Sequence, residues 1–380
     1  MNGVYLVAAA VMPFGKHEDS SPAELGGTAA LDLINSVGLN PEHIDIGFVG
    51  SVYGGSLIAQ RVLQRAGISG QPVFSVENAC ASGGSAVNLA FQAIAAGTAE
   101  SAVVVGVDQL STFGGGALPL TTADAETAQG VVMPATYAMR AQRYVHESGA
   151  DSQVLDRISV KNRANGADNA RAHFQKAVTP EDVALSRPVA DPLKLLHCCP
   201  NSDGAAAVLL CNAEVARTLA ADVVRVRASV VKSGTFHTSF RDMTWPDITE
   251  RAARAAYQMA GIEPNDLDLV ELHDAFSIAE LLHAEALGIA ERWKAHAAVD
   301  AGEFDRDGRI AVSPSGGLLS RGHPVGATGV SQICEAYWQL TGTAGPLQVP
   351  GATVALTHTT GGGIFGVDNG ACTIHVLTAD

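Results

Sequence analysis

Two segments place a chemically reactive side chain beside the expected start of a helix. Cys80 lies in VENACASGG, after an expected strand at 73–76 and before an expected small-residue helix at 83–96. Unpaired N–H groups at a helix start favour a thiolate there, and small neighbours let a substrate approach closely. His323 lies in the turn RGHPVG, where a fixed imidazole can accept a thiol proton or polarise a carbonyl. A lone cysteine or histidine is more often structural, so both interpretations stay open at this point.

A third segment, ELHDAFSIAEL, ends an expected strand at 268–272 with His273 and Asp274. Open α/β sheets bind their ligands at the carboxyl ends of strands, which makes His273 a candidate site residue. The alternative is an Asp or Ser helix cap with an incidental histidine.

A fourth segment, ALTHTTGGGIFGVDNG, carries His358 and a run of glycines. Gly361, Gly363 and Gly366 match the spacing GxGxxG, but a strand follows instead of the helix that a dinucleotide site needs. We expect a sharp turn here, with backbone N–H groups that can point at a developing oxyanion. The chain has no GxxxxGK[ST] loop for a nucleoside triphosphate.

The elements that must position these residues alternate between short β-rich runs and longer helical patterns, which is typical of an α/β protein. The pattern predicts two halves of similar outline, 1–222 and 223–380, with a loop-and-helix insertion at about 115–195. Sequence identity between the halves is not visible, so a duplication is a topological inference only. The expected strands are 3–10, 46–52, 73–76, 102–108, 204–211, 224–231, 268–272, 352–358 and 371–377. The expected helices are 22–37, 58–66, 83–96, 213–220, 248–260, 277–287 and 326–341.

Composition narrows the class of protein. The 380 residues are 47% apolar and 17% charged, with a net charge of −15, which excludes a disordered chain and argues against nucleic-acid binding. Low charge and 40 glycines predict much buried surface, including a subunit interface. Signal-peptide features and an apolar run of about 18 residues are missing, so we expect a cytoplasmic enzyme that does not bind membranes. The six cysteines include no CxxC pair, so we expect neither a disulfide scaffold nor a metal site.

Taken together, these segments resemble the thiolase superfamily along essentially the whole chain. NACASG is similar to the family's nucleophile loop, NSDGAAAVLL to the segment closing its N-terminal half, and GGLLSRGHPVGATG to its glycine-histidine-proline signature. The resemblance implies the thiolase fold, in which two similar α/β halves form five αβαβα layers with a loop domain over coenzyme A. The His273-Asp274-Ala275-Phe276 form is similar to the sterol-carrier-protein type of thiolase and its bacterial relatives.

The resemblance also implies a role for each candidate. Cys80 would take the acyl group as a thioester, and His323 would activate Cys80. With a water held by His273, His323 would also bind the thioester oxygen of the second substrate. The N–H groups of Cys80 and Gly361 would form the other oxyanion hole. Coenzyme A would be a substrate, with no permanently bound cofactor.

The chain departs from the family at the second cysteine, the acid/base for the α-carbon proton. Common thiolases carry it in Cys-x-Gly, where this chain has Thr359-Thr360-Gly361, and sterol-carrier types carry it in His-Asp-Cys-Phe, where this chain has Ala275. A threonine hydroxyl is too weak an acid to replace it. Our hypothesis is that His358, His273, a bound water or a substrate carboxylate handles this proton.

The favoured function is thiolysis of a 3-ketoacyl-CoA, or the reverse Claisen condensation. Relatives with the His-Asp motif often handle unusual aromatic, branched or dicarboxylic substrates such as benzoylsuccinyl-CoA. They often work beside a small zinc-ribbon/OB-fold protein, and we expect a homodimer or tetramer. The alternatives are a decarboxylating Claisen enzyme, an aldolase (although such aldolases lack the nucleophilic cysteine) and a non-catalytic acyl-CoA-binding subunit. Four basic residues in the insertion are candidates for the CoA phosphates, with exposed, solvated charge as the alternative: Lys161, Arg163, Arg171 and Lys176.

Overall fold

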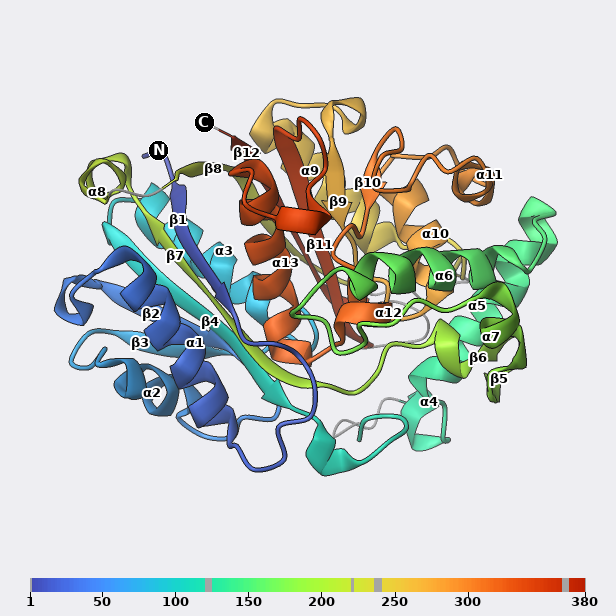
Figure 1. The fold of residues 1–380 in the computed structure, drawn as a ribbon, viewed down its shortest axis with the longest axis horizontal. Helices are drawn as coiled ribbons and strands as arrows, with labels where there is room; N and C mark the ends of the chain where they lie inside the picture. The colour runs from blue at the N-terminus through green and yellow to red at the C-terminus, as the bar shows by residue number, and fades with distance from the viewer. Residues whose placement is uncertain (1, 120–124, 220–221, 236–240, 364–368, 380) are drawn as a thin grey trace.

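A ten-stranded mixed sheet runs through the protein in the computed structural model, which describes residues 2–119, 125–219, 222–235, 241–363 and 369–379 (Figure 1). The strand order is β10-β9-β11-β12-β8-β1-β7-β4-β2-β3. The first half contributes β1 (Tyr5–Val11), β2 (Ile46–Gly50), β3 (Val73–Val76), β4 (Ser101–Gln109) and β7 (Asp203–Cys211). The second half contributes β8 (Val224–Ser233), β9 (Leu269–Glu271), β10 (Ala311–Val312), β11 (Val354–Gly363) and β12 (Asn369–Ala379).

The two halves of the sheet repeat one topology. Counted within each half, the strands lie in the order third, second, fourth, fifth, first: β3-β2-β4-β7-β1 in one half and β10-β9-β11-β12-β8 in the other. The halves join where β1 pairs antiparallel with β8, Tyr5 opposite Arg225 and Leu6 opposite Val224. The similar outline expected of the two halves is therefore present as a shared strand order.

Helices divide the molecule into five layers. The central helices α3 (Ser82–Ala95) and α13 (Val325–Leu340) pack on each other and on strands of both halves. The helices α1 (Pro22–Val37) and α2 (Ile58–Leu63) cover the outer face of the first half, and α9 (Asp247–Ala260) and α10 (Ser277–Ala286) cover that of the second. Apolar side chains fill the spaces between the layers and exclude water, which stabilises the stack. The expected αβαβα arrangement is confirmed.

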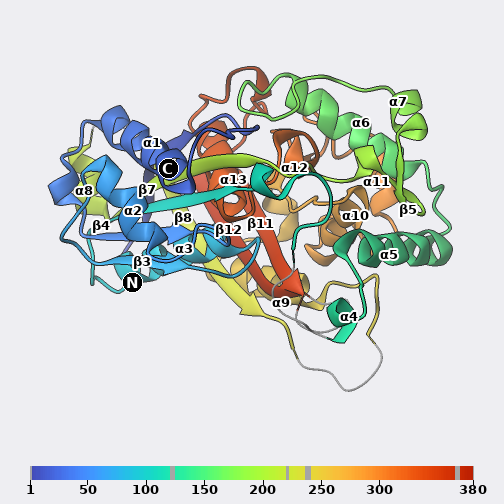
Figure 2. The same cartoon turned by 90° about the horizontal axis from the view of Figure 1, so that it is seen from below.

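The insertion between β4 and β7 leaves the first half and lies over the second (Figures 1 and 2). Its helix α6 (Val154–Ala167) contacts α10, α11 (Ala295–Asp300) and α12 (Gly317–Arg321). The insertion also contains α4 (Ala125–Ala128), α5 (Met133–Ser148), α7 (Pro180–Leu185) and the two-stranded sheet of β5 (Pro188–Ala190) and β6 (Leu193–Lys194). The helix α8 (Ala213–Thr218) follows β7.

Local sequence signals account for some boundaries and fail at others. The helix α1 begins and ends where the sequence predicts, because Ser21 and Glu24 form a capping box and Gly38 takes the left-handed conformation (φ 63°) that ends it. The strand extends further into the glycine run than expected: Gly361 and Gly363 lie within β11, opposite Ala371 and Asn369. Pairing with a neighbouring strand outweighs the flexibility of these glycines, and Gly366 lies outside the described residues. None of the helices in the described part of the chain combines the length and apolarity needed to cross a membrane.

Candidate active site

Three loops bring the sulfur of Cys80 and ring nitrogens of His273 and His323 together. One such atom from each residue lies within 4.8 Å of the other two. Cys80 precedes the central helix α3, His323 lies between α12 and the central helix α13, and His273 follows β9. The structure therefore joins three residues that are up to 243 positions apart in the sequence.

The Cys80 thiol rests in its protonated form. Its pKa is raised to about 12, mainly by burial and in part by the charge of Asp108, although a hydrogen bond from the Gly362 amide opposes the shift. The start of α3, which was expected to favour the thiolate, does not outweigh the cost of burying that charge. A base must remove the proton as the sulfur attacks.

His323 is set up as that base. The Thr328 hydroxyl donates to the Pro324 carbonyl (3.0 Å) and lies 2.7 Å from His323 Nδ1. Because this hydroxyl has one proton, Nδ1–H must donate to its oxygen, which leaves the lone pair on Nε2. Burial, together with the charges of His273 and Arg321, holds the pKa of His323 well below its usual range. The imidazole is therefore neutral and able to accept the thiol proton.

His273 is also neutral, because burial lowers its pKa to about 3. Its Nδ1 is buried and has no hydrogen-bond partner among the described residues. An unpartnered polar atom is costly when buried, unless a water or a substrate oxygen bonds it. His273 is thus able to hold a polar group within the cluster.

His358 does not join the cluster but supports it from the opposite face of β11. Its Nε2 lies 3.1 Å from the Thr249 hydroxyl, and its Nδ1 accepts the backbone N–H of His273 (3.5 Å). The side chain is fully buried. Successive strand residues face opposite sides, and the next residue, Thr359, bonds Thr373 on the other side of the strand. His358 thus contacts the backbone of His273 and positions that residue.

Gly361 lies against the backbone of the nucleophile loop. A Cβ atom at this position would lie 2.4 Å from Asn78 O and 2.8 Å from Cys80 N, so only glycine fits. The amide that bonds the Cys80 thiol belongs to the next residue, Gly362. The pairing of the Cys80 and Gly361 amides as an oxyanion hole stays a prediction.

Two buried carboxylates hold the turn that carries His323. Asp108, from the first half, accepts the N–H of Gly326 (2.8 Å) at the start of α13 and the N–H of Tyr53 (2.8 Å). Asp274, from the second half, accepts the N–H of Leu318 (2.7 Å) in α12. Sequence reasoning missed Asp108, because it ends an ordinary buried strand and belongs to no motif.

The four candidate CoA-binding cations differ in their surroundings. The Lys161 ammonium lies 3.0 Å from Glu280, the Arg163 guanidinium stacks 4.2 Å from the Phe174 ring centre, and Arg171 pairs with Glu335 at 3.2 Å. Each of these three has a partner within the chain, whereas the Lys176 side chain is exposed. Contact of any of the four with coenzyme A stays a prediction.

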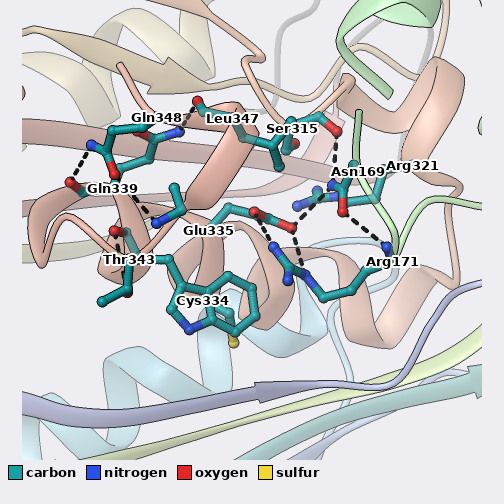
Figure 3. A network of polar contacts seen from close by, with 12 residues as sticks. Asn169, Arg171, Ser315, Arg321, Cys334, Glu335, Gln339, Thr343, Leu347 and Gln348 are labelled. Carbon is teal, nitrogen blue, oxygen red and sulfur yellow. Dashed lines mark hydrogen bonds and ion pairs between the residues drawn. The ribbon is translucent and has the colours of Figure 1, made fainter. Parts of the chain in front are cut away.

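Arg171 belongs to a polar network that no sequence motif predicts (Figure 3). Asn169 donates to the Ser315 carbonyl (3.0 Å), and Asn169 and Arg171 both contact Glu335. Fully buried Arg321, two residues before His323, has its Nη1 3.9 Å from the Glu271 carboxylate. The network ties the insertion to the turn that carries His323.

The geometry places a protonated cysteine beside two neutral histidines, within an α/β fold whose two halves share one topology. Two families match the chain: "Thiolase, N-terminal domain" over residues 4–214 and "Thiolase C-terminal domain-like" over residues 229–368. The chain therefore belongs to the thiolase family, and it is a thiolase-type acyltransferase.

Relatives agree with this assignment. The benzoylsuccinyl-CoA thiolase subunit BbsB of Thauera aromatica is 40% identical over 95% of both chains. An acetyl-CoA acetyltransferase of Methanothermobacter thermautotrophicus is 40% identical over 100% of both chains. Proteins named sterol carrier protein 2 are also among the relatives. The solved structure of an Ltp2-ChsH2(DUF35) aldolase superimposes with a TM-score of 0.86 at 27% identity, covering 100% of this chain and 98% of that one.

Proposed function

We propose that this enzyme cleaves a 3-ketoacyl-CoA with coenzyme A, or runs the reverse condensation, through an acyl group on Cys80. The observation that carries the proposal is the Cys80, His273 and His323 cluster, in which a protonated thiol meets two neutral imidazoles within 4.8 Å. Coenzyme A acts as a substrate, and no permanently bound cofactor is proposed.

The reaction has two halves. The Nε2 of His323 takes the Cys80 proton while the sulfur attacks the 3-keto carbon, and the amides of Cys80 and Gly361 hold the oxyanion. The bond between carbons 2 and 3 breaks, leaving the shortened acyl chain on Cys80 and releasing the enolate of the CoA thioester that keeps carbons 1 and 2. His273 holds a water that, with His323, binds the enolate oxygen, and carbon 2 gains a proton. Coenzyme A then attacks the thioester and frees Cys80.

The acyl group we propose is an unusual one, aromatic, branched or dicarboxylic, of the kind found in benzoylsuccinyl-CoA. The supporting observation is the 40% identity to a benzoylsuccinyl-CoA thiolase subunit over 95% of both chains. Equal identity to an acetyl-CoA acetyltransferase makes acetoacetyl-CoA the competing substrate. The exposed Lys176 is the candidate contact for the CoA phosphates.

We also propose that the enzyme is a homodimer or tetramer that works with a small zinc-ribbon/OB-fold protein. A structural neighbour whose name includes a DUF35 component supports a partner of this kind. Size measurement of the purified chain, alone and with such a candidate partner, tests both parts.

The test of the function is a panel of 3-ketoacyl-CoAs, including acetoacetyl- and benzoylsuccinyl-CoA, incubated with coenzyme A, with and without the candidate partner. We expect acyl-CoA products, and an acyl mass increase that maps to the Cys80 peptide and is absent in Cys80→Ala. A chelator arm separates acyl transfer from zinc binding, for which a thiol and two imidazoles are also suitable donors. Turnover that survives in Cys80→Ala would overturn the acyl-enzyme proposal.

The second candidate is carbon–carbon cleavage without coenzyme A, favoured by the structural likeness to an aldolase. An aldol reaction needs no acyl-cysteine, so it would persist in Cys80→Ala and would not depend on added coenzyme A. A retro-aldol reaction cleaves a 3-hydroxyacyl-CoA, so incubating such thioesters without coenzyme A, beside the 3-ketoacyl-CoA panel, decides between the two candidates.

A further inference from the structure

A second thiol lies beside the cluster, opposite Ala275. Cys198 and Phe276 form an antiparallel bridge, and the Cys199 N–H donates to the Ala275 carbonyl at 2.9 Å. Opposed residues of an antiparallel pair project from the same face, with Cβ atoms about 4.5–5.5 Å apart. The side chain of Cys199 therefore shares a face with that of Ala275, two residues after His273.

The backbone contact with Ala275, two residues after His273, places Cys199 beside the cluster, and its pKa responds to groups of that cluster. The charges of Cys80 and of Asp274 both raise the pKa of Cys199. The charges of Cys80 and Cys199 both raise the pKa of the Tyr137 hydroxyl. Cys80 and Cys199 are each only partly buried. His273, two residues before Ala275, belongs to the cluster with Cys80, and its buried Nδ1 has no partner among the described residues.

We propose that the Cys199 thiol exchanges the proton at carbon 2 of the acyl-CoA, taking the place of the second cysteine that is absent from positions 275 and 359. The inference rests on the proposed function, since it needs an enolate formed at acyl-Cys80. In thiolysis the S–H of Cys199 gives its proton to carbon 2 of the enolate, forming a C–H bond and leaving a thiolate. That thiolate takes the proton of the incoming coenzyme A thiol, whose sulfur attacks acyl-Cys80, and the cycle closes with no net change at Cys199.

The other groups near the cluster fit this task less well. His358 has both ring nitrogens occupied by Thr249 and the His273 backbone. His273 has a pKa of about 3, so it carries no acidic imidazolium proton at neutral pH. Burial raises the pKa of Cys199 well above its usual value, so this thiol is protonated when the enolate forms. Thiolysis requires a protonated acid to give its proton to carbon 2, and condensation requires a strong base to remove that proton. The Cys199 thiol and its thiolate meet these two requirements.

The neighbouring cysteine provides a matched control. Cys198 is also partly buried, but its thiol points to the carbonyl of Lys194 at 3.4 Å. Adjacent residues of an extended pair face opposite sides, so Cys198 does not share the face of Ala275. Cys198→Ala should therefore leave the proton transfer unchanged.

The experiment compares the full chain with Cys199→Ala, Cys199→Ser and Cys198→Ala in three measurements. These are acylation of Cys80 by acetyl-CoA, exchange of the carbon-2 protons of acetyl-CoA with D2O, and complete thiolysis. We expect both Cys199 variants to acylate Cys80 like wild type, while exchange and thiolysis fall by about 10²–10⁴-fold. We expect Cys198→Ala to match wild type in all three.

Two outcomes separate this inference from the proposed function. If Cys199→Ser exchanges carbon-2 protons at the wild-type rate, Cys199 is not the acid/base. If wild-type Cys80 is acylated neither by acetyl-CoA nor by any 3-ketoacyl-CoA of the panel, the proposed function fails, whatever Cys199 does. A rescue variant, Ala275→Cys in the Cys199→Ala background, should recover exchange because the two side chains share a face. Loss of Cys80 acylation in both Cys199 variants would overturn the inference by assigning Cys199 a structural role.

Discussion

The two halves of the molecule share a strand order, and each places a reactive residue just before its central helix. Cys80 precedes α3 in the first half, and His323 precedes α13 in the second. Equivalent positions in the fold thus hold the proposed nucleophile and its proposed base. The duplicated topology brings the starts of the two central helices together, and the residue types at those starts divide the chemistry.

The halves differ most in what joins their fourth and fifth strands. In the first half β4 and β7 are separated by residues 110–202, and in the second β11 and β12 are separated by residues 364–368. The long connection crosses to the second half, where Asn162 donates to Asp274 (2.7 Å) and Cys199 donates to Ala275. The second half therefore carries the histidines, and the insertion from the first half completes their surroundings.

The largest expected effect tests the division between His323 and His358. His323→Ala should lower kcat by about 10²–10⁴-fold because the thiol loses its base. His358→Gln should cost less, about tenfold, because His358 acts only through the backbone of His273. Steady-state thiolysis measures both. Equal losses of kcat in the two variants would show that His323 does not act as the base and has no larger role than His358.

His273→Ala and His358→Gln also test the hypothesis that a histidine handles the carbon-2 proton. With Cys199 as the acid/base, both variants should retain measurable exchange of that proton with D2O. Complete loss of exchange in either variant, with Cys80 acylation intact, would return the role to that histidine.

The sequence predicted which residues form the site better than it predicted their protonation. Cys80, His273 and His323 were identified because each lies in a short motif at an element boundary. The helix start was expected to favour the Cys80 thiolate, but burial keeps the thiol protonated, and burial depends on distant segments that no local pattern reveals. Asp108, Arg321 and Cys199 were missed for a related reason: each acts on a residue brought near by the fold.

The carboxylate from each half should make a similar contribution to holding the His323 turn. Asp108→Asn replaces a carboxylate with an amide that has one acceptor oxygen fewer, so an N–H such as that of Gly326 loses its acceptor. Asp274→Asn does the same to the N–H of Leu318. Each change should lower the free energy of unfolding by about 1–3 kcal/mol. Chemical denaturation measures this loss, with Asp151→Asn as an exposed control. A loss in only one variant would mean that one half holds the turn alone.

A smaller effect is expected from the hydroxyl that sets the His323 tautomer. Thr328→Val removes the acceptor for Nδ1–H, so the Nε2 lone pair is no longer favoured, and kcat/KM should fall about tenfold. Thr328→Ser keeps the hydroxyl and should retain most of the activity. If Thr328→Val matches wild type across the pH profile, the tautomer is fixed by something else.

The smallest expected effect concerns the proton on Glu271, beside Arg321 in the second half. Burial raises the pKa of Glu271 from 4.5 to about 7, although the charge of Arg321 opposes the shift. Between these pH values the folded state holds a proton that the unfolded chain has released, so this contribution to stability is lost as pH rises through about 7. Glu271→Gln cannot titrate, so its free energy of unfolding relative to wild type should improve between pH 5 and pH 8. Denaturation at the two pH values measures the change, with exposed Glu42→Gln as the control. A relative stability that worsens with pH would mean that Glu271 is held ionised by Arg321, and the turn before His323 would then rest on a true ion pair.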